Sequence, residues 1–259
     1  MNATTRRDAL VVGGGVAGLT AATFLSRAGL DTLVVNAGES IVRRNAHLEN
    51  VPGFPAGVNS RLFTDLLDEQ ASRAGAETFT GRVVGLDVLG TDDDPLFCAT
   101  VETDDETVEL TATRVVAASW ADASYLEATG AELRQAGSKT YVDVDELGRT
   151  SVPGLYAAGR LTEIYHQTVV AAGDAAETAI TLIHDSETPF YNDWVAPEGY
   201  FTERGREVPP ACEEIDAAER ERRETESREV MREFFSERHP EPQRTHPSLV
   251  DDELGRVDE

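Results

Sequence analysis

The sequence has little cysteine: of 259 residues, only Cys98 and Cys212 carry a thiol, and they lie far apart along the chain. Two distant thiols argue against a disulfide-rich scaffold, a zinc site built on cysteines and a C-x-x-C redox pair. No apolar run approaches the roughly 20 residues that a membrane-spanning helix needs. No cluster of His, Cys and Asp has metal-ligand spacing. We therefore expect no disulfide framework, no bound metal and no membrane partner.

Lysine is almost absent, whereas acidic residues are abundant. Lys139 is the single lysine among 23 basic residues, against 48 acidic ones, and the formal net charge is −25. Such a charge repels itself at low ionic strength and is screened by salt. This composition is typical of cytosolic proteins of salt-accumulating organisms such as halophilic archaea; an ordinary acidic protein with an acidic tail is the alternative. No basic face is visible, which disfavours nucleic acid as a partner.

The N-terminus contains one pattern that resembles an export signal. Arg6 and Arg7, followed by the apolar residues from Ala9 onward, mimic the start of a twin-arginine signal. No A-x-A-like cleavage site follows, and the apolar stretch also forms part of a glycine-rich motif. A cytoplasmic protein is therefore the expectation.

The first part of the chain reads as strand, glycine turn, helix, strand. Residues 8–12 (DALVV) and 31–35 (DTLVV) are short apolar runs typical of buried parallel strands. Residues 16–27 have helical periodicity and end at Ala28-Gly29, a plausible helix C-cap. The pattern predicts a βαβ unit.

The turn of this unit fits G-x-G-x-x-G at Gly13, Gly15 and Gly18. The first glycine permits a tight turn, the second lets the backbone approach a pyrophosphate, and the third lets helix and strand pack closely. The helix N-terminus, with Val16 and Ala17, then offers N–H groups to phosphates. The motif predicts a dinucleotide site, although glycines that serve only a tight turn would look the same.

The rest of residues 1–185 predicts one α/β domain. We expect a Rossmann-like fold with a parallel central sheet and a small antiparallel β-meander. The predicted elements are a helix from its cap Ser60 to about residue 74, stopped by Gly75; a hairpin of 96–102 and 107–112 around Asp104-Asp105; a buried strand at 113–119; a short strand, a turn and an apolar run within 141–158; and a helix at about 169–184.

Residues 186–259 have a different composition and are predicted to form a C-terminal extension. An irregular segment with aromatic residues, 189–211, is expected to drape over a surface. A charged helix at about 213–238 has the i, i+4 pairs Glu219–Arg223 and Glu224–Arg228 and an apolar end; it is either a solvated helix held by its last turns or a partner-binding helix. Residues 240–259 are predicted to be disordered.

Motifs at both ends of the domain make a more specific pattern. LVVNAGES is followed by Arg43-Arg44-Asn45, HLENVPGFPAG covers 47–57, and GRTSVPGLYAAG (148–159) precedes IYHQTVVAAGDAAETA (164–179). With the glycine motif, these stretches resemble the two FAD-binding parts of the thioredoxin reductase family over most of residues 8–185.

The resemblance implies FAD as the cofactor. The residues expected to contact it are Gly13, Gly15, Val16, Ala17, Gly18, Asn36, Ala37, Glu39, Arg43, Asn45, Val84, Trp120, Gly159, Arg160, Gln167 and Thr168. No catalytic residue is assigned. His47 and His166 fall on loops that would approach the flavin, where each can move protons or serve as an ordinary polar contact.

The chain departs from that family between its two FAD-binding parts. The family inserts an NADPH-binding domain there, whereas here a short linker near 119–140 connects them, without a second glycine motif and without the family's C-x-x-C. A dithiol relay within this chain is therefore not expected.

Three single positions also depart from the family's motifs. Asn36 replaces the usual acidic residue and can still accept a hydrogen bond from a ribose hydroxyl, although more weakly than a carboxylate; Glu39 lies close by. Trp120 stands at a glycine position, where it either stacks on a ring or fills the volume of the missing domain. Arg160 replaces an aspartate and either clamps a phosphate or is only a surface charge.

The sequence therefore predicts an FAD-binding oxidoreductase without its own NADPH domain. Its electrons would come from free NAD(P)H, a small substrate or a redox partner protein. A non-catalytic FAD- or nucleotide-binding regulatory subunit is the main alternative, and a plain NAD-dependent dehydrogenase is a third. A homodimer is expected, because the family pairs through its FAD domains.

Overall fold

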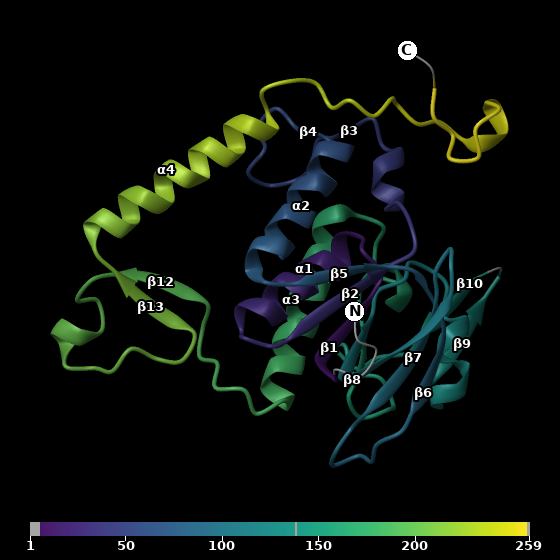
Figure 1. The fold of residues 1–259 in the computed structure, drawn as a ribbon, viewed down its shortest axis with the longest axis horizontal. Helices are drawn as coiled ribbons and strands as arrows, with labels where there is room; N and C mark the ends of the chain where they lie inside the picture. Colours follow the sequence, from purple (N-terminus) through teal and green to yellow (C-terminus); the bar gives the residue numbers. More distant parts are fainter. Residues whose placement is uncertain (1–5, 138, 258–259) are drawn as a thin grey trace.

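The computed structural model describes residues 6–137 and 139–257. A seven-stranded sheet lies at its centre, in the order β5-β2-β1-β8-β7-β6, and β11 also pairs with β8 (Figure 1). Its strands are β1 (Arg7–Val12), β2 (Thr32–Asn36), β5 (Glu77–Thr80), β6 (Arg82–Val88), β7 (Phe97–Glu102), β8 (Thr107–Ala117) and β11 (Leu155–Ala157). The predicted α/β fold, with a mostly parallel sheet and an antiparallel meander, is confirmed.

Strand β1 is buried on both faces because different elements cover the two sides of the sheet. It lies between β2 and β8 and runs parallel to both. Ala9 and Val11 pack with the helices α1 (Val16–Arg27) and α3 (Thr168–Asp185). Leu10 and Val12 pack on the other side with the meander. Alternation along one strand thus places two separate apolar clusters.

The predicted hairpin and the predicted following strand share one long strand. β8 runs without interruption from Thr107 to Ala117, because no turn residue separates the two predicted pieces. Its first half pairs antiparallel with β7, as expected for the hairpin around Asp104-Asp105. Its second half pairs parallel with β1 and β11. β8 therefore joins the meander to the parallel sheet.

Helix α2 (Ser60–Ala74) has the predicted length but a different cap. The side chain of Asn59 accepts hydrogen bonds from the N–H groups of Arg61 and Leu62, whereas the Ser60 hydroxyl donates to the carbonyl of Asn45. Gly75 ends the helix at a φ of +104°, as predicted.

The segment between β8 and β11 is short and contains little regular structure. It consists of the 3₁₀-helix η2 (Ser124–Thr129) and a hairpin of β9 (Leu133–Ala136) and β10 (Lys139–Val142). The sequence pattern predicts only one short strand here. A second, smaller hairpin pairs β3 (His47–Leu48) with β4 (Val58–Asn59), and the 3₁₀-helix η1 (Ile41–Arg44) precedes it.

The extension forms its own small unit beside the domain (Figure 1). β12 (Trp194–Pro197) pairs parallel with β13 (Cys212–Ile215), and α4 (Ala217–Phe234) follows. The helix begins later than predicted because residues 212–215 form a strand, and Asp216 caps it. Trp194, Tyr200 and Phe201 pack edge-to-face on one another, with ring centroids 4.6–5.6 Å apart. These three aromatic side chains make their own cluster, whereas Phe190, at the start of the same segment, packs against the domain core as predicted.

The last residues differ from the predicted disorder. Residues 240–257 cross the domain near β3, β4 and α2 (Figure 1), and Arg244 is buried among them. Residues 258–259 lie outside the described part of the chain. In the described ranges, no helix is long and apolar enough to cross a membrane.

Candidate functional site

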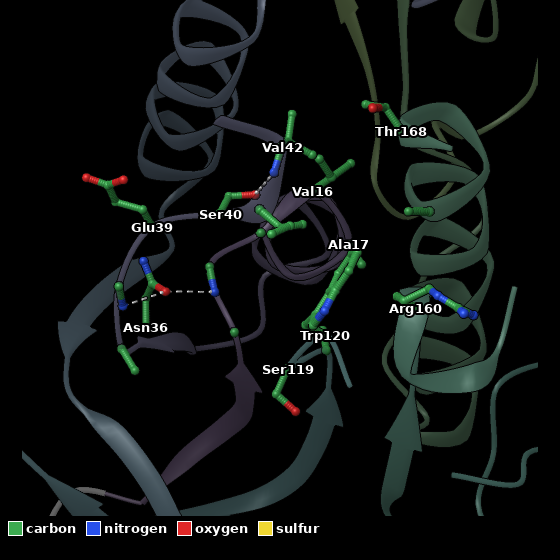
Figure 2. Close-up of a pocket in the computed structure, with 18 of the residues that line it drawn as sticks. Val16, Ala17, Asn36, Glu39, Ser40, Val42, Ser119, Trp120, Arg160 and Thr168 are labelled. Atoms are coloured by element: carbon green, nitrogen blue, oxygen red, sulfur yellow. Dashed lines mark hydrogen bonds between the residues drawn. The ribbon is translucent and has the colours of Figure 1, made fainter. Parts of the chain in front are cut away.

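A large pocket opens at the carboxyl ends of β1, β2 and β8. Its volume is about 800 Å³ (Figure 2). Its walls come from the glycine turn, the loop after β2, the end of β8 and the loop that leads into α3. This edge of a parallel α/β sheet is where such folds bind ligands. The pocket therefore joins segments from both ends of the domain.

The three motif glycines have the separate roles that the motif predicts. A Cβ on Gly13, whose φ is +116°, would lie 2.5 Å from the carbonyl oxygen of Ala118, and one on Gly18 would lie 1.8 Å from that of Gly13. These glycines allow the tight turn and the close helix packing. A Cβ on Gly15 would meet only the Ser40 hydroxyl, at 3.6 Å. Gly15 therefore faces open space in front of α1.

Two helix N-termini face this pocket without a side-chain cap. Gly15 occupies the N-cap position of α1, and Gln167 occupies that of α3. No side chain at either position accepts a hydrogen bond from the first N–H groups of the helix. The first turns of both helices also lack acidic residues. Their N–H groups and positive dipole ends can therefore bind an anionic group.

The side chain of Asn36 links the glycine turn to the loop that follows β2. Its Oδ1 lies 3.4 Å from the backbone nitrogens of Gly14 and Gly38 (Figure 2). The oxygen that was expected to accept from a ribose thus already accepts two long backbone hydrogen bonds. The Nδ2 amide remains as a donor toward a ligand.

Trp120 has a glycine-like backbone at the end of β8. Its φ is +65°, a conformation that is uncommon for bulky residues and that clusters at functional sites. Its indole lies edge-to-face against His166, with ring centroids 4.7 Å apart. Burial, together with the charges of Arg160 and Lys139, lowers the pKa of His166. The lowered pKa favours the neutral imidazole in this contact with the indole.

The side chain of Arg160 already binds neighbouring protein groups. Its guanidinium donates to the Tyr141 hydroxyl at 2.8 Å and to the carbonyl of Ile164 at 3.2 Å, and it lies 5.1 Å from the centre of the Tyr141 ring. Tyr141 belongs to β10. Arg160 thus ties the β9–β10 hairpin to the pocket wall, a role that neither sequence-based interpretation included.

Most of the predicted contact residues lie around this pocket. The lining includes Gly13, Gly15, Val16, Ala17, Asn36, Ala37, Glu39, Asn45, Trp120, Arg160, Gln167 and Thr168, as well as His47 and His166. Gly18, Arg43, Val84 and Gly159 lie outside it.

Each of these four has a local reason for its position. Gly18 packs against the glycine turn, and the N–H of Gly159 donates to Asp174 at 2.6 Å, a carboxyl whose pKa burial raises. Arg43 points toward α2 and the C-terminal segment. Val84 is 41% exposed, whereas its neighbour Val83 lines the pocket, because side chains alternate along β6.

Several lining residues were not predicted. They include Ser40, Ile41, Val42, Gly81, Ser119 and Tyr125. Gly81 follows β5 directly, so the carboxyl end of a fourth parallel strand was the signal that could have identified it. Within residues 6–137 and 139–257, no group of three or more His, Cys, Asp or Glu side chains could hold a metal ion.

Comparisons with known proteins agree on the class of this site. Residues 8–47 match a family model described as an FAD binding domain. This stretch contains β1, the glycine turn, α1, β2 and the loop that lines the pocket.

More particular matches are to thioredoxin reductases. That of Streptomyces coelicolor is 38% identical over 88 residues, which are 32% of this chain and 27% of that protein. That of Schizosaccharomyces pombe is 31% identical over 134 residues, or 49% of this chain and 40% of that protein. The solved thioredoxin reductase of Gloeobacter violaceus aligns over 73% of this chain and 99% of that chain, with a TM-score of 0.61 and 18% identity.

The chain is therefore similar to thioredoxin reductases in sequence over part of its length and in fold, and FAD is the supported cofactor. The matched stretches span from about a quarter to two fifths of the two curated relatives' length. The predicted resemblance and cofactor are confirmed.

Proposed function

We propose that this chain is an FAD-dependent oxidoreductase of the thioredoxin reductase type that works without an NADPH domain or a redox disulfide of its own. The main support is the pocket, which gathers the glycine turn, the loop after β2 and the N-terminus of α3 around one space. A volume of about 800 Å³ is within the range of cofactor sites.

The residues of the pocket fit FAD. The uncapped N-terminus of α1, entered through Gly15, would hold the pyrophosphate. Asn36 and Glu39 would contact the adenosine ribose, and the loop before α3 would contact the flavin side. Bound FAD supplies electron and hydride transfer, and the protein supplies binding, orientation and electrostatic tuning.

The proposed absence of an NADPH domain is supported by the segment between β8 and β11. Its described residues form only η2 and the β9–β10 hairpin.

The proposed absence of a redox disulfide is supported by the state of Cys98. This cysteine is buried, and burial raises the pKa of its thiol, so it is a poor redox nucleophile. Electrons would then come from free NAD(P)H, a small substrate or a partner protein.

A non-catalytic FAD-binding subunit is the second candidate. Trp120, 36% exposed and in contact with His166, favours it, because an indole at this wall narrows the access of a second substrate.

One experiment tests both functions. The protein is purified in high salt, its flavin spectrum is recorded, and NADH or NADPH is added without oxygen. Bleaching of a yellow protein supports the oxidoreductase with free NAD(P)H as donor. A yellow protein that does not bleach supports the non-catalytic subunit or a different donor, and a protein that cannot take up FAD contradicts both.

We also propose a cytoplasmic homodimer. Met231 and Phe235, at the end of α4, are 40% and 48% exposed and offer apolar contact area. A mass measurement in high salt that returned only a monomer would contradict this assembly.

A further inference from the structure

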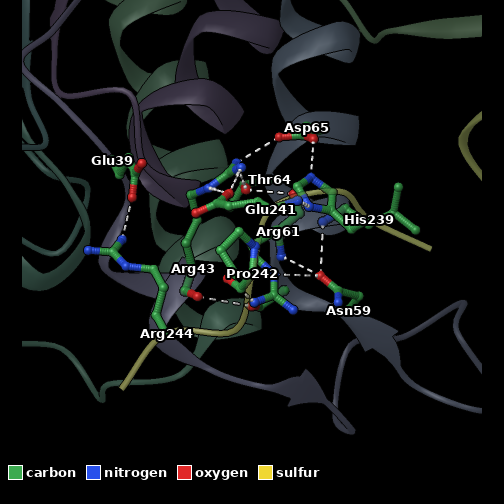
Figure 3. Close-up of polar contacts among 12 residues, drawn as sticks. Glu39, Arg43, Asn59, Arg61, Thr64, Asp65, His239, Glu241, Pro242 and Arg244 are labelled. Atoms are coloured by element: carbon green, nitrogen blue, oxygen red, sulfur yellow. Dashed lines mark hydrogen bonds and ion pairs between the residues drawn. The ribbon is translucent and has the colours of Figure 1, made fainter. Parts of the chain in front are cut away.

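The C-terminal segment, residues 239–257, binds the loop that follows β2, residues 37–45. Arg244 is 5% exposed and forms an ion pair with Glu39 (Figure 3). Its guanidinium also donates to the carbonyl of Leu254, at 2.8 Å from Nε and 2.6 Å from Nη2. A buried guanidinium with these partners has a fixed orientation, so it holds the Glu39 carboxylate in one place.

A second contact fixes the other end of the same loop. Arg43 forms ion pairs with Glu241 and with Asp65 of α2, the latter at 2.7 Å. His239 lies 2.8 Å from the other oxygen of Asp65 (Figure 3). The loop, the helix and the C-terminal segment therefore meet in one polar cluster.

A third contact joins the C-terminal segment to the start of α2. Arg61, which is 5% exposed, donates to the carbonyl of Pro242 at 2.9 Å. Arg61 also donates to Asn59, the cap of α2, at 3.3 Å.

The C-terminal segment supports the loop from outside the pocket. Residues 37–42 and Asn45 line the pocket, whereas no residue of 239–257 does. Ala37, Gly38 and Glu39 are exposed even with the C-terminal segment in place, so the segment holds the loop through the ion pairs of Glu39 and Arg43 and does not cover it. The segment thus restrains the loop without filling the space for a ligand.

On the basis of the proposed function, we infer that Arg244 and Glu241 are positioning residues of the FAD site. They hold the loop 37–45 in the shape that receives the adenosine side of the cofactor. A flexible loop loses conformational entropy when a ligand binds, and this loss weakens the affinity. A loop that is already ordered avoids most of that cost. None of the residues predicted to contact FAD lies in the extension. The extension nevertheless shapes the site, because it holds one of the loops that line it.

The test compares two arginine substitutions in the full-length protein. Arg244→Ala removes the contact with Glu39, whereas the control Arg228→Ala removes an equal charge that forms an ion pair with Glu224 on α4. Dissociation constants for FAD and for ADP are measured by calorimetry in high salt. Arg244→Ala should weaken both by a similar factor of about ten, and Arg228→Ala should bind like the wild type.

A second pair of variants tests whether Arg244 acts through Glu39. In a Glu39→Ala background, Arg244→Ala should cause little further loss, because the partner is already gone. Arg244→Lys keeps a cation for Glu39 but loses the double contact with Leu254, so it should recover part of the affinity. A purely structural role predicts the same loss in both backgrounds.

The results distinguish this inference from the proposed function. A wild-type protein that binds neither FAD nor ADP overturns both. A wild type that binds FAD, with an Arg244→Ala variant that binds it equally or more tightly, overturns only the role of the C-terminal segment. If Arg244→Ala lowers FAD affinity as much in the Glu39→Ala background as in the wild type, Arg244 does not act through Glu39, and its positioning role is overturned.

Discussion

The domain and the extension are stabilised in different ways. In the domain, β1, β8 and α3 contribute side chains to two apolar clusters in which many residues are fully buried. In the extension, α4 has no buried residue and is surrounded by ion pairs such as Arg223–Glu213 at 2.7 Å and Arg73–Glu226 at 2.8 Å. Apolar burial is strong and depends little on salt, whereas exposed ion pairs are weak and are screened by it. Function depends on both, because the pocket is in the domain and its loop is held by the extension.

The largest effect on stability should come from the domain core. Leu25 of α1 is fully buried against the sheet. Leu25→Ala should lower the free energy of unfolding by about 2–5 kcal/mol, because it leaves a cavity. Urea unfolding followed by circular dichroism measures this, and a loss below that range would mean that the core can collapse around the gap.

A comparable effect on binding should come from Gly15→Asp, without a loss of stability. The new carboxylate would cap α1 and so occupy the place of an anionic ligand. FAD affinity should fall at least about 100-fold, or about 2.7 kcal/mol, while the melting temperature stays the same or rises. Gly15→Ala separates the effect of the charge from that of the added Cβ, which meets only the Ser40 hydroxyl at 3.6 Å. It should lose less FAD affinity than Gly15→Asp, and an equal loss in both variants would contradict the role of the charge.

Substitutions of Trp120 test the cost of its positive φ, which is the strained backbone position in the wall of the pocket. Both Trp120→Gly and Trp120→Ala remove the indole, but alanine retains the unfavourable positive φ. The glycine variant should be more stable than the alanine variant by about 0.5–1 kcal/mol, after the greater freedom of glycine in the unfolded chain is included. Equal stabilities would show that the backbone relaxes once the indole is removed.

The smallest effect is expected on α4. Arg228→Ala breaks an exposed i, i+4 pair with Glu224 at 2.6 Å. It should cost about 0.3–0.5 kcal/mol in low salt and less in molar salt. Thermal unfolding at two salt concentrations measures this, and a cost near that of Leu25→Ala would contradict the division between the two regions.

The same division explains what the sequence could predict. Apolar periodicity located α1, α2 and α3, because each helix buries one face, and a short apolar run located β1, because that strand is buried on both faces. It could not decide whether Val83 or Val84 faces the pocket, because the two side chains point to opposite faces of the strand and a shift of one residue exchanges them.

Long-range polar contacts were beyond sequence reasoning. The contact of Arg244 with Glu39 spans 205 residues, and the low apolar content of the tail suggested disorder. Arg160 was recognised as a departure from its motif, but its partner Tyr141 could not be predicted, because it lies on an unpredicted hairpin.

The central claim is that the two ends of the domain grip one FAD, and a titration of two matched variants tests it most directly. Gly15→Asp and Thr168→Asp place a carboxylate at the N-termini of α1 and α3, respectively, where each should leave the helix stable. The wild type should bind one FAD per chain, and each variant alone should lose that binding. A Thr168→Asp variant that binds FAD as tightly as the wild type would contradict the claim.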